Sequence, residues 1–98
     1  MNMLDKLRRR IPDAENEQLL ADLLSAAADM ICAYTMRASV PEKLSGAQIE
    51  IAVILFNRMG MEGESSHAEG SVSRSAESLP EYLRRQLNPW RAAKAVGA

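Results

Sequence analysis

Residues 49–56 read IEIAVILF, and every position from Ile51 to Phe56 is apolar. Pro41 can occupy the first position of a helix, where its missing N–H is not needed, and Gly60 fits a left-handed C-terminal cap. We therefore predict a helix over 41–59. Because its apolar run would need contacts on nearly all sides, this helix should be the central element against which the others pack.

The first residues of the chain predict a short opening helix. Leu4, Leu7 and Ile11 are spaced i, i+3, i+7 and form one apolar stripe. Pro12 interrupts a helix, so this element should span about 2–11.

A longer amphipathic helix is predicted for about 14–37. Asp13 is placed to cap it, and Glu17 suits the positive end of the helix dipole. The small residues of SAAAD at 25–29 would let another helix approach closely. The expected core consists of Leu20, Leu24, Ile31, Ile51, Ile54 and Leu55.

Residues 61–78, MEGESSHAEGSVSRSAES, consist mainly of Ser, Gly and charged residues. Such a segment buries too little apolar area to offset its loss of conformational entropy, so we predict a long exposed loop. A last short helix should follow over about 79–88. Ser78 is its expected cap, Pro80 its first residue and Pro89 its end.

The basic tail, 89–98, leaves two roles open for Trp90. This side chain could clamp the tail onto the core of its own chain, or it could be an anchor presented to another protein. Only four aromatic residues occur among 98, so the core must be aliphatic. The sequence predicts one all-α domain over 1–98, a small bundle of about four helices with a long Gly/Ser-rich loop before the last one.

Residue types for catalysis and metal binding are scarce in this chain. His67 is the one histidine and Cys32 the one cysteine, so a zinc site and a histidine-based triad lack their parts. We expect no enzymatic activity, no metal and no cofactor. No apolar run approaches the roughly 18 residues of a membrane span, so we expect a cytosolic protein without targeting.

The net charge of −1 argues against a domain held on nucleic acid by a broad basic surface. Charge instead alternates in blocks, with net +3 over 1–10, −5 over 11–36, +1 over 37–58, −3 over 59–79 and +3 over 80–98. Such blocks are typical of solvated faces. They would also suit one copy docking against the opposite sign of the next.

From position 40 onward the chain carries several phrases in a fixed order. VPEKL stands at 40–44, and residues 48–91 read QIEIAVILFNRMGMEGESSHAEGSVSRSAESLPEYLRRQLNPWR. An apolar helix ends in Asn-Arg-x-Gly, a Gly/Ser/Glu loop with G-x-S follows, and Leu-Pro-Glu opens a short basic helix. The acidic helix before them ends in Tyr34-Thr35-x-Arg37.

This order resembles the gp6-like head-to-tail connector (adaptor) proteins of tailed bacteriophages and prophages, over almost the whole chain. The sequence departs from that pattern at 88–90, Asn-Pro-Trp, where the family more often continues with basic residues and Tyr. The resemblance implies a small helical structural protein without catalytic activity.

The resemblance also implies partners and a place in the virion. Copies would form a ring, of about twelve in the virion, beneath the portal vertex of the filled head. The ring would extend the channel through which DNA passes without sequence-specific binding, and would dock the next head-completion or tail protein. Assembly would take place in the host cytoplasm.

The long loop and the last helix are the expected contact surface with a neighbouring subunit or the portal. A loop that cannot fold alone can be ordered by a partner, and a ring needs two different faces that meet. The expected contact residues are Glu64, Ser65, Ser66, His67, Glu69, Ser71, Val72, Ser73, Arg74, Arg84, Arg85, Trp90 and Arg91.

A small prophage-encoded helical DNA-binding regulator is the alternative function. Its candidate phosphate contacts are RRR at 8–10, Arg84, Arg85, Arg91 and Lys94. The predicted helix over 79–88 is too short for a good recognition helix and offers only Gln86 and Asn88 as base-reading amides.

Overall fold

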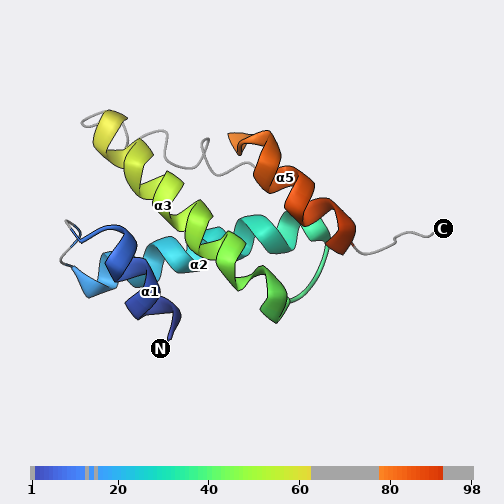
Figure 1. Cartoon of the computed structure of the whole chain (residues 1–98), viewed down its shortest axis with the longest axis horizontal. Helices are drawn as coiled ribbons and strands as arrows, with labels where there is room; N and C mark the ends of the chain where they lie inside the picture. The colour runs from blue at the N-terminus through green and yellow to red at the C-terminus, as the bar shows by residue number, and fades with distance from the viewer. Residues whose placement is uncertain (1, 13, 15, 63–77, 92–98) are drawn as a thin grey trace.

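Figure 1 shows the chain in a computed structural model, which describes residues 2–12, 14, 16–62 and 78–91. The elements are α1 (Met3–Arg10), α2 (Glu17–Thr35), η1 (Glu42–Leu44), α3 (Ser45–Glu62), α5 (Glu81–Leu87) and η5 (Asn88–Trp90), where η denotes a 3-10 helix. No strand occurs among the described residues. The all-α bundle predicted from the sequence is confirmed.

The crossing of α2 and α3 organises the fold. α3 passes in front of α2 in Figure 1, and the contact between these two helices is the most extensive one between elements. Ala27 of α2 and Ala47 and Ala52 of α3 are buried. Small side chains let helix backbones approach closely. Gln48 of α3 donates from Nε2 to the backbone oxygen of Leu24 at 2.9 Å, so a buried amide also joins the helices.

The core is aliphatic and draws on every helix. Of the six residues expected there, Leu20, Ile31, Ile51 and Leu55 are buried, whereas Leu24 and Ile54 are partly buried and pack at its edge. Further fully buried leucines are Leu7, Leu44, Leu83 and Leu87. α1 contacts both central helices and α5 packs on α2, so α3 shares with α2 the central position predicted for it alone.

The predicted start of α2 was wrong. Asn16 is the N-cap, because its Oδ1 accepts hydrogen bonds from two backbone N–H groups of the first turn at 2.8 and 3.2 Å. Asp13 lies outside the described residues. The N–H of Ala14 donates to the oxygen of Ile11, and both residues are buried. The buried Ile11 and Ala14 thus form a turn that packs on the core after α1. The next helix begins only after this turn, at Glu17.

The end of α2 has an unusual backbone conformation. Met36 follows the last helical residue and adopts the left-handed region, with φ 61° and ψ 39°. Its N–H donates to the oxygen of Cys32, which closes the helix. Glycine usually fills this position, because a Cβ there is strained. Nothing in the sequence marks Met36 as a cap.

Both predicted ends of α3 were wrong. Pro41 has an extended ψ of 145° and precedes η1, so α3 starts at Ser45. The helix then continues through Gly60 to Glu62. A single glycine weakens a helix by about 1 kcal/mol but removes no hydrogen bond, and no proline follows to stop the helix.

The last helix is shorter than the predicted span of 79–88. Pro80 has a ψ of 151° and flanks the helix, which begins at Glu81. Ser78 does not cap it, because the N-cap position is occupied by Pro80, and Oγ of Ser78 accepts a hydrogen bond from Arg58 instead. Pro89 does not end the helical path, which continues as η5 through Trp90. Most of the predicted loop, residues 63–77, lies outside the described residues.

Within the described helices, none has the length and hydropathy needed to cross a membrane.

Candidate interaction surfaces

The residues expected to contact partners fall into two groups. Those of the loop lie outside the described residues: Glu64, Ser65, Ser66, His67, Glu69, Ser71, Val72, Ser73 and Arg74. The other four lie on α5, on η5 and directly after them: Arg84, Arg85, Trp90 and Arg91. Only this second group can be placed against the helices.

Trp90 and Arg91 belong to a set of contacts that we call the terminal clamp, formed by Tyr34, Arg37, Asn88, Trp90 and Arg91. Arg37 donates from Nε to the backbone oxygen of Trp90 at 2.6 Å, and its guanidinium lies 5.8 Å from the centroid of the indole. Arg91 lies 4.8 Å above the ring of Tyr34. The hydroxyl of Tyr34 donates to Oδ1 of Asn88. The clamp fastens the residues after α5 to the end of α2.

These contacts bear on the first of the two roles left open for Trp90, that of a clamp within its own chain. Its side chain is partly buried and packs at the edge of the core, and both its carbonyl and its ring contact Arg37. The structure therefore matches the role of a clamp within the chain. The phrase Tyr34-Thr35-x-Arg37 was visible in the sequence, but only the fold shows that it receives Trp90.

Arg84 and Arg85 differ in how their charges are used. Arg85 is exposed and pairs with Glu81 one turn away, with Nη2 and Oε2 3.0 Å apart. Such i,i+4 pairs contribute about 0.3–0.5 kcal/mol. Nε of Arg84 is buried and has no hydrogen-bond partner among the described residues. Of the two, Arg84 therefore has hydrogen-bonding capacity that the described part of the chain leaves unused.

Arg58, in the Asn-Arg-x-Gly phrase, joins α3 to the residues before α5. It donates from Nη1 to Oγ of Ser78 at 2.9 Å and from Nη2 to the backbone oxygen of Ser78. Two donors of one guanidinium thus hold one residue, which is a geometrically specific contact. It fixes the position at which the chain returns to the helices.

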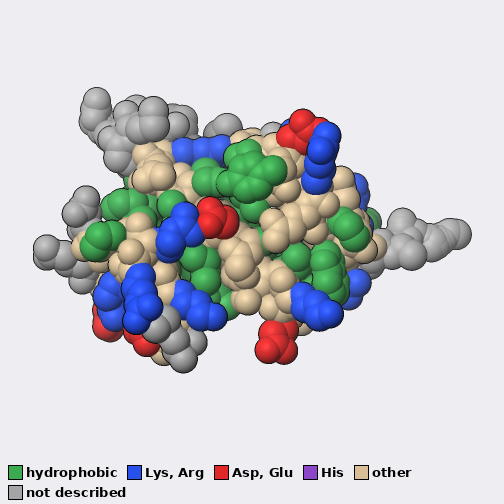
Figure 2. Space-filling view, in the orientation of Figure 1, with side chains coloured by type: hydrophobic (Ala, Val, Ile, Leu, Met, Phe, Trp, Pro, Cys, Tyr) green, Lys and Arg blue, Asp and Glu red, His purple; other side chains and the backbone are tan. Residues whose placement is uncertain are grey.

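A shallow hollow of about 460 Å³ lies between α1 and α3, and we call it the basic groove. Its lining consists of Lys6, Arg9, Arg10, Gly46, Ile49 and Glu50. Figure 2 shows Lys and Arg side chains gathered over α1 on this side of the molecule. Arg10 pairs with Glu50 and ties α1 to α3. The hydrogen bond that Arg10 donates to Glu50, and then the negative charge of Glu50, raise the pKa of Arg10, so this guanidinium stays charged.

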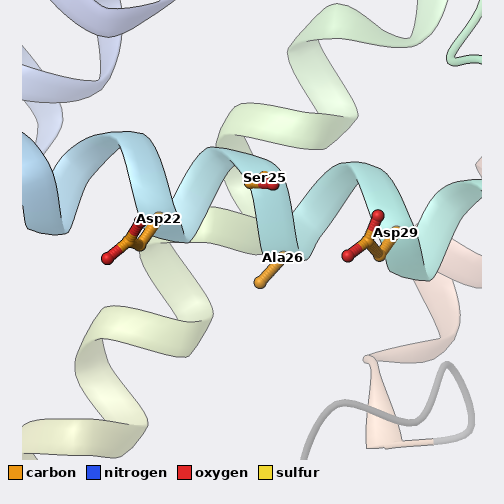
Figure 3. A pocket seen from close by; sticks show the side chains of 4 residues that line it. All are labelled: Asp22, Ser25, Ala26 and Asp29. Carbon is orange, nitrogen blue, oxygen red and sulfur yellow. The ribbon is translucent and has the colours of Figure 1, made fainter.

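A second surface lies on α2 and carries the opposite charge. Asp22, Ser25, Ala26 and Asp29 line a hollow of about 340 Å³, which we call the acidic face. In Figure 3 their side chains lie on the near side of α2, while α3 crosses behind it. The acidic face therefore points away from the α2–α3 crossing.

Among the described residues that line these two surfaces, no side-chain nucleophile is hydrogen-bonded to a general base. Within residues 2–12, 14, 16–62 and 78–91, no cluster of three or more His, Cys, Asp or Glu is arranged to hold a metal. Sequence reasoning missed the basic groove, because its residues come from segments about forty positions apart. The charge pattern of the sequence contained a sign of both surfaces. The basic block 1–10 supplies the cations of the groove, and the acidic block 11–36 supplies the aspartates of the acidic face.

Comparison with protein families gives one match. The model of the family described as phage gp6-like head-tail connector protein matches residues 1–91, which include every described helix. Comparisons with curated proteins and with solved structures give no match.

Proposed function

Since the chain belongs to the phage gp6-like head-tail connector protein family, which it matches over residues 1–91, we propose that it forms a ring beneath the portal of the filled head. A head-tail connector is a structural component of the virion, and the family match is the observation that carries this function. The ring extends the DNA channel and docks the next connector or tail protein. About twelve copies fit the symmetry of such a joint.

Two features of the surface support assembly into a ring. A ring is built from heterologous contacts, in which one face of a copy meets a different face of the next copy. The basic groove and the acidic face are two such surfaces of opposite charge, and they lie on different helices. The low net charge of −1 suits a channel wall past which DNA moves without being held.

The loop and α5 are the proposed contact with the portal. Arg84 and Arg85 are two cations of α5, half-buried and exposed respectively, and an acidic surface on the portal would complement them. The loop residues from Glu64 to Arg74 remain part of the proposal. Arg58 holds Ser78 in place from α3, so the loop can be shortened without moving the start of α5.

The test uses the purified chain and purified portal protein of the same phage. Electron micrographs of the chain alone at high concentration should show rings. Micrographs of its mixture with portal should show these rings stacked on portal. A variant in which Gly63 to Ser75 is replaced by a short Gly/Ser linker should keep its helical circular dichroism and lose portal binding. A chain that stays monomeric with and without portal contradicts the function. Salt-sensitive binding of random duplex in a gel shift would instead support a DNA-binding protein.

A further inference from the structure

We propose that the basic groove of one copy binds the acidic face of α2 on a second copy, so that these surfaces form the repeating contact between subunits. The inference rests on the proposed ring, and it names which two surfaces of the helical domain meet. It is separate from the proposed portal contact of the loop and α5.

Charge is the first argument for this pairing. Three basic residues and one acidic residue line the groove, which gives net +2, and two aspartates line the acidic face, which gives net −2. Glu50 is already paired with Arg10. Lys6 and Arg9 are exposed and form no ion pair among the described residues. Two cations of the groove are therefore available for a partner.

The aspartates of the acidic face are available in the same way. Asp29 has no ion pair or hydrogen bond from its side chain within the described part of the chain, and Asp22 accepts only from Gln18, at 2.9 Å. By contrast, Arg8 and Arg85 are paired with acids of their own chain. Within the described part of the chain, Lys6 and Arg9 on one surface and Asp22 and Asp29 on the other are thus charges of opposite sign without an ion pair.

Shape is the second argument. Gly46 is exposed on the first turn of α3, and a Cβ built on it meets no atom within 4 Å, so there is open space above the groove. Ile49 is buried and forms an apolar floor. On the acidic face, Ser25 and Ala26 are small, and the flanking aspartates are seven residues apart, about 10.5 Å along the helix axis. A helix with a small centre and charged flanks fits a groove with an open centre and a charged rim.

Placement makes the contact intermolecular. α3 lies in front of α2 in Figure 1, and the basic side chains over α1 are on that side in Figure 2. Figure 3 shows the acidic face on the side of α2 away from α3. One copy therefore cannot close this contact on itself, and each copy offers both halves. Repeating such a contact produces a ring or a helical array.

The test is a charge-reversal pair studied by sedimentation velocity. D22R/D29R makes both surfaces positive, and K6E/R9E makes both negative, so each variant alone should assemble at a concentration at least about tenfold higher than the unchanged chain. An equimolar mixture restores opposite charges at every contact and should assemble like the unchanged chain. Each variant should keep the circular dichroism of the parent, since all four side chains are exposed.

Matched controls separate the two surfaces from general charge effects. The single reversals D29R and R9E, measured beside the double variants, have controls of equal charge change. E42R matches D29R and K43E matches R9E, and both control positions are exposed on η1 outside the two surfaces. These controls should assemble like the unchanged chain. An uncharged variant, Gly46→Trp, should also impair assembly, because a Cβ at this position meets no atom of its own copy within 4 Å and the indole would occupy the open centre of the groove.

The outcomes distinguish this inference from the proposed function. If the unchanged chain forms rings and both reversed variants form them equally well, the ring stands and this contact is wrong. If K6E/R9E forms rings but loses portal binding or low-salt duplex binding, the groove's occupant is portal or DNA, and the proposal is overturned. If the unchanged chain never self-associates, with or without portal, the ring and the contact both fail.

Discussion

The α2–α3 crossing and the terminal clamp both join α2 to a distant part of the chain, but they use different forces. The crossing is apolar, with fully buried residues such as Ala27 and Ile51 and one satisfied amide from Gln48. The clamp is built from two cation–π contacts and two hydrogen bonds, in which exposed arginines meet the half-buried rings of Tyr34 and Trp90. Burial therefore sets the stability of the domain, whereas the clamp sets the position of residues 88–91.

The largest expected effect comes from opening a cavity beside the crossing. Ile51→Ala should lower the free energy of unfolding by about 2–4 kcal/mol, because Ile51 is fully buried and the cavity can collapse only in part. Ile54→Ala is the matched control one turn along the same helix. Ile54 is only partly buried, so the loss should be about 1 kcal/mol. Urea denaturation followed by circular dichroism measures both, and equal losses would mean that burial at the crossing does not dominate.

Breaking the clamp should have a smaller and more local effect. Arg37→Ala removes the hydrogen bond to the Trp90 carbonyl and the cation over the indole, which together contribute about 1–1.5 kcal/mol. Trp90 is the chain's single tryptophan, so its fluorescence reports on the clamp directly. Its emission should shift to longer wavelength and acrylamide quenching should increase, while the helical signal is kept.

Arg37→Lys controls for charge in this experiment. A lysine keeps a cation near the indole but lacks the planar donor group that reaches the carbonyl. We expect an emission maximum between those of the parent and Arg37→Ala. If Arg37→Ala leaves both emission and quenching unchanged, Arg37 does not hold Trp90.

The smallest expected effect tests the turn between the two regions. Met36→Gly relieves the left-handed conformation of a residue whose side chain is mostly exposed, and should raise the free energy of unfolding by about 0.5 kcal/mol. Met36→Ala keeps the Cβ and should give no gain. Thermal unfolding of both variants is the measurement, and equal stability of the two would show that the turn is not strained.

The two regions also differ in how far the sequence predicts them. The helices near the crossing follow from apolar periodicity, so Leu20, Ile31, Ile51 and Leu55 were placed in the core correctly. Helix ends depend on single hydrogen bonds that several residues could make. Asn16 rather than Asp13 caps α2 for this reason.

Surfaces that combine distant segments were the least predictable part. The basic groove needs α1 beside the start of α3, and the terminal clamp needs Tyr34 and Arg37 beside η5. Neither juxtaposition is encoded by local spacing, because it follows from how the helices pack. The charge blocks and the Tyr-Thr-x-Arg motif indicated which residues would take part in these contacts. They did not indicate which residues lie opposite them.

The two hydrogen bonds from Arg58 to Ser78 affect how this fold tolerates a change in the length of the segment between Glu62 and Ser78. Because the guanidinium holds the returning chain from α3, the position of α5 does not depend on the number of residues between Glu62 and Ser78. The closure entropy of a connection grows slowly with its length, by only about 0.6 kcal/mol for each doubling. This interval is therefore where an insertion, such as a peptide tag or a short binding module, should be accommodated while the helices keep their places.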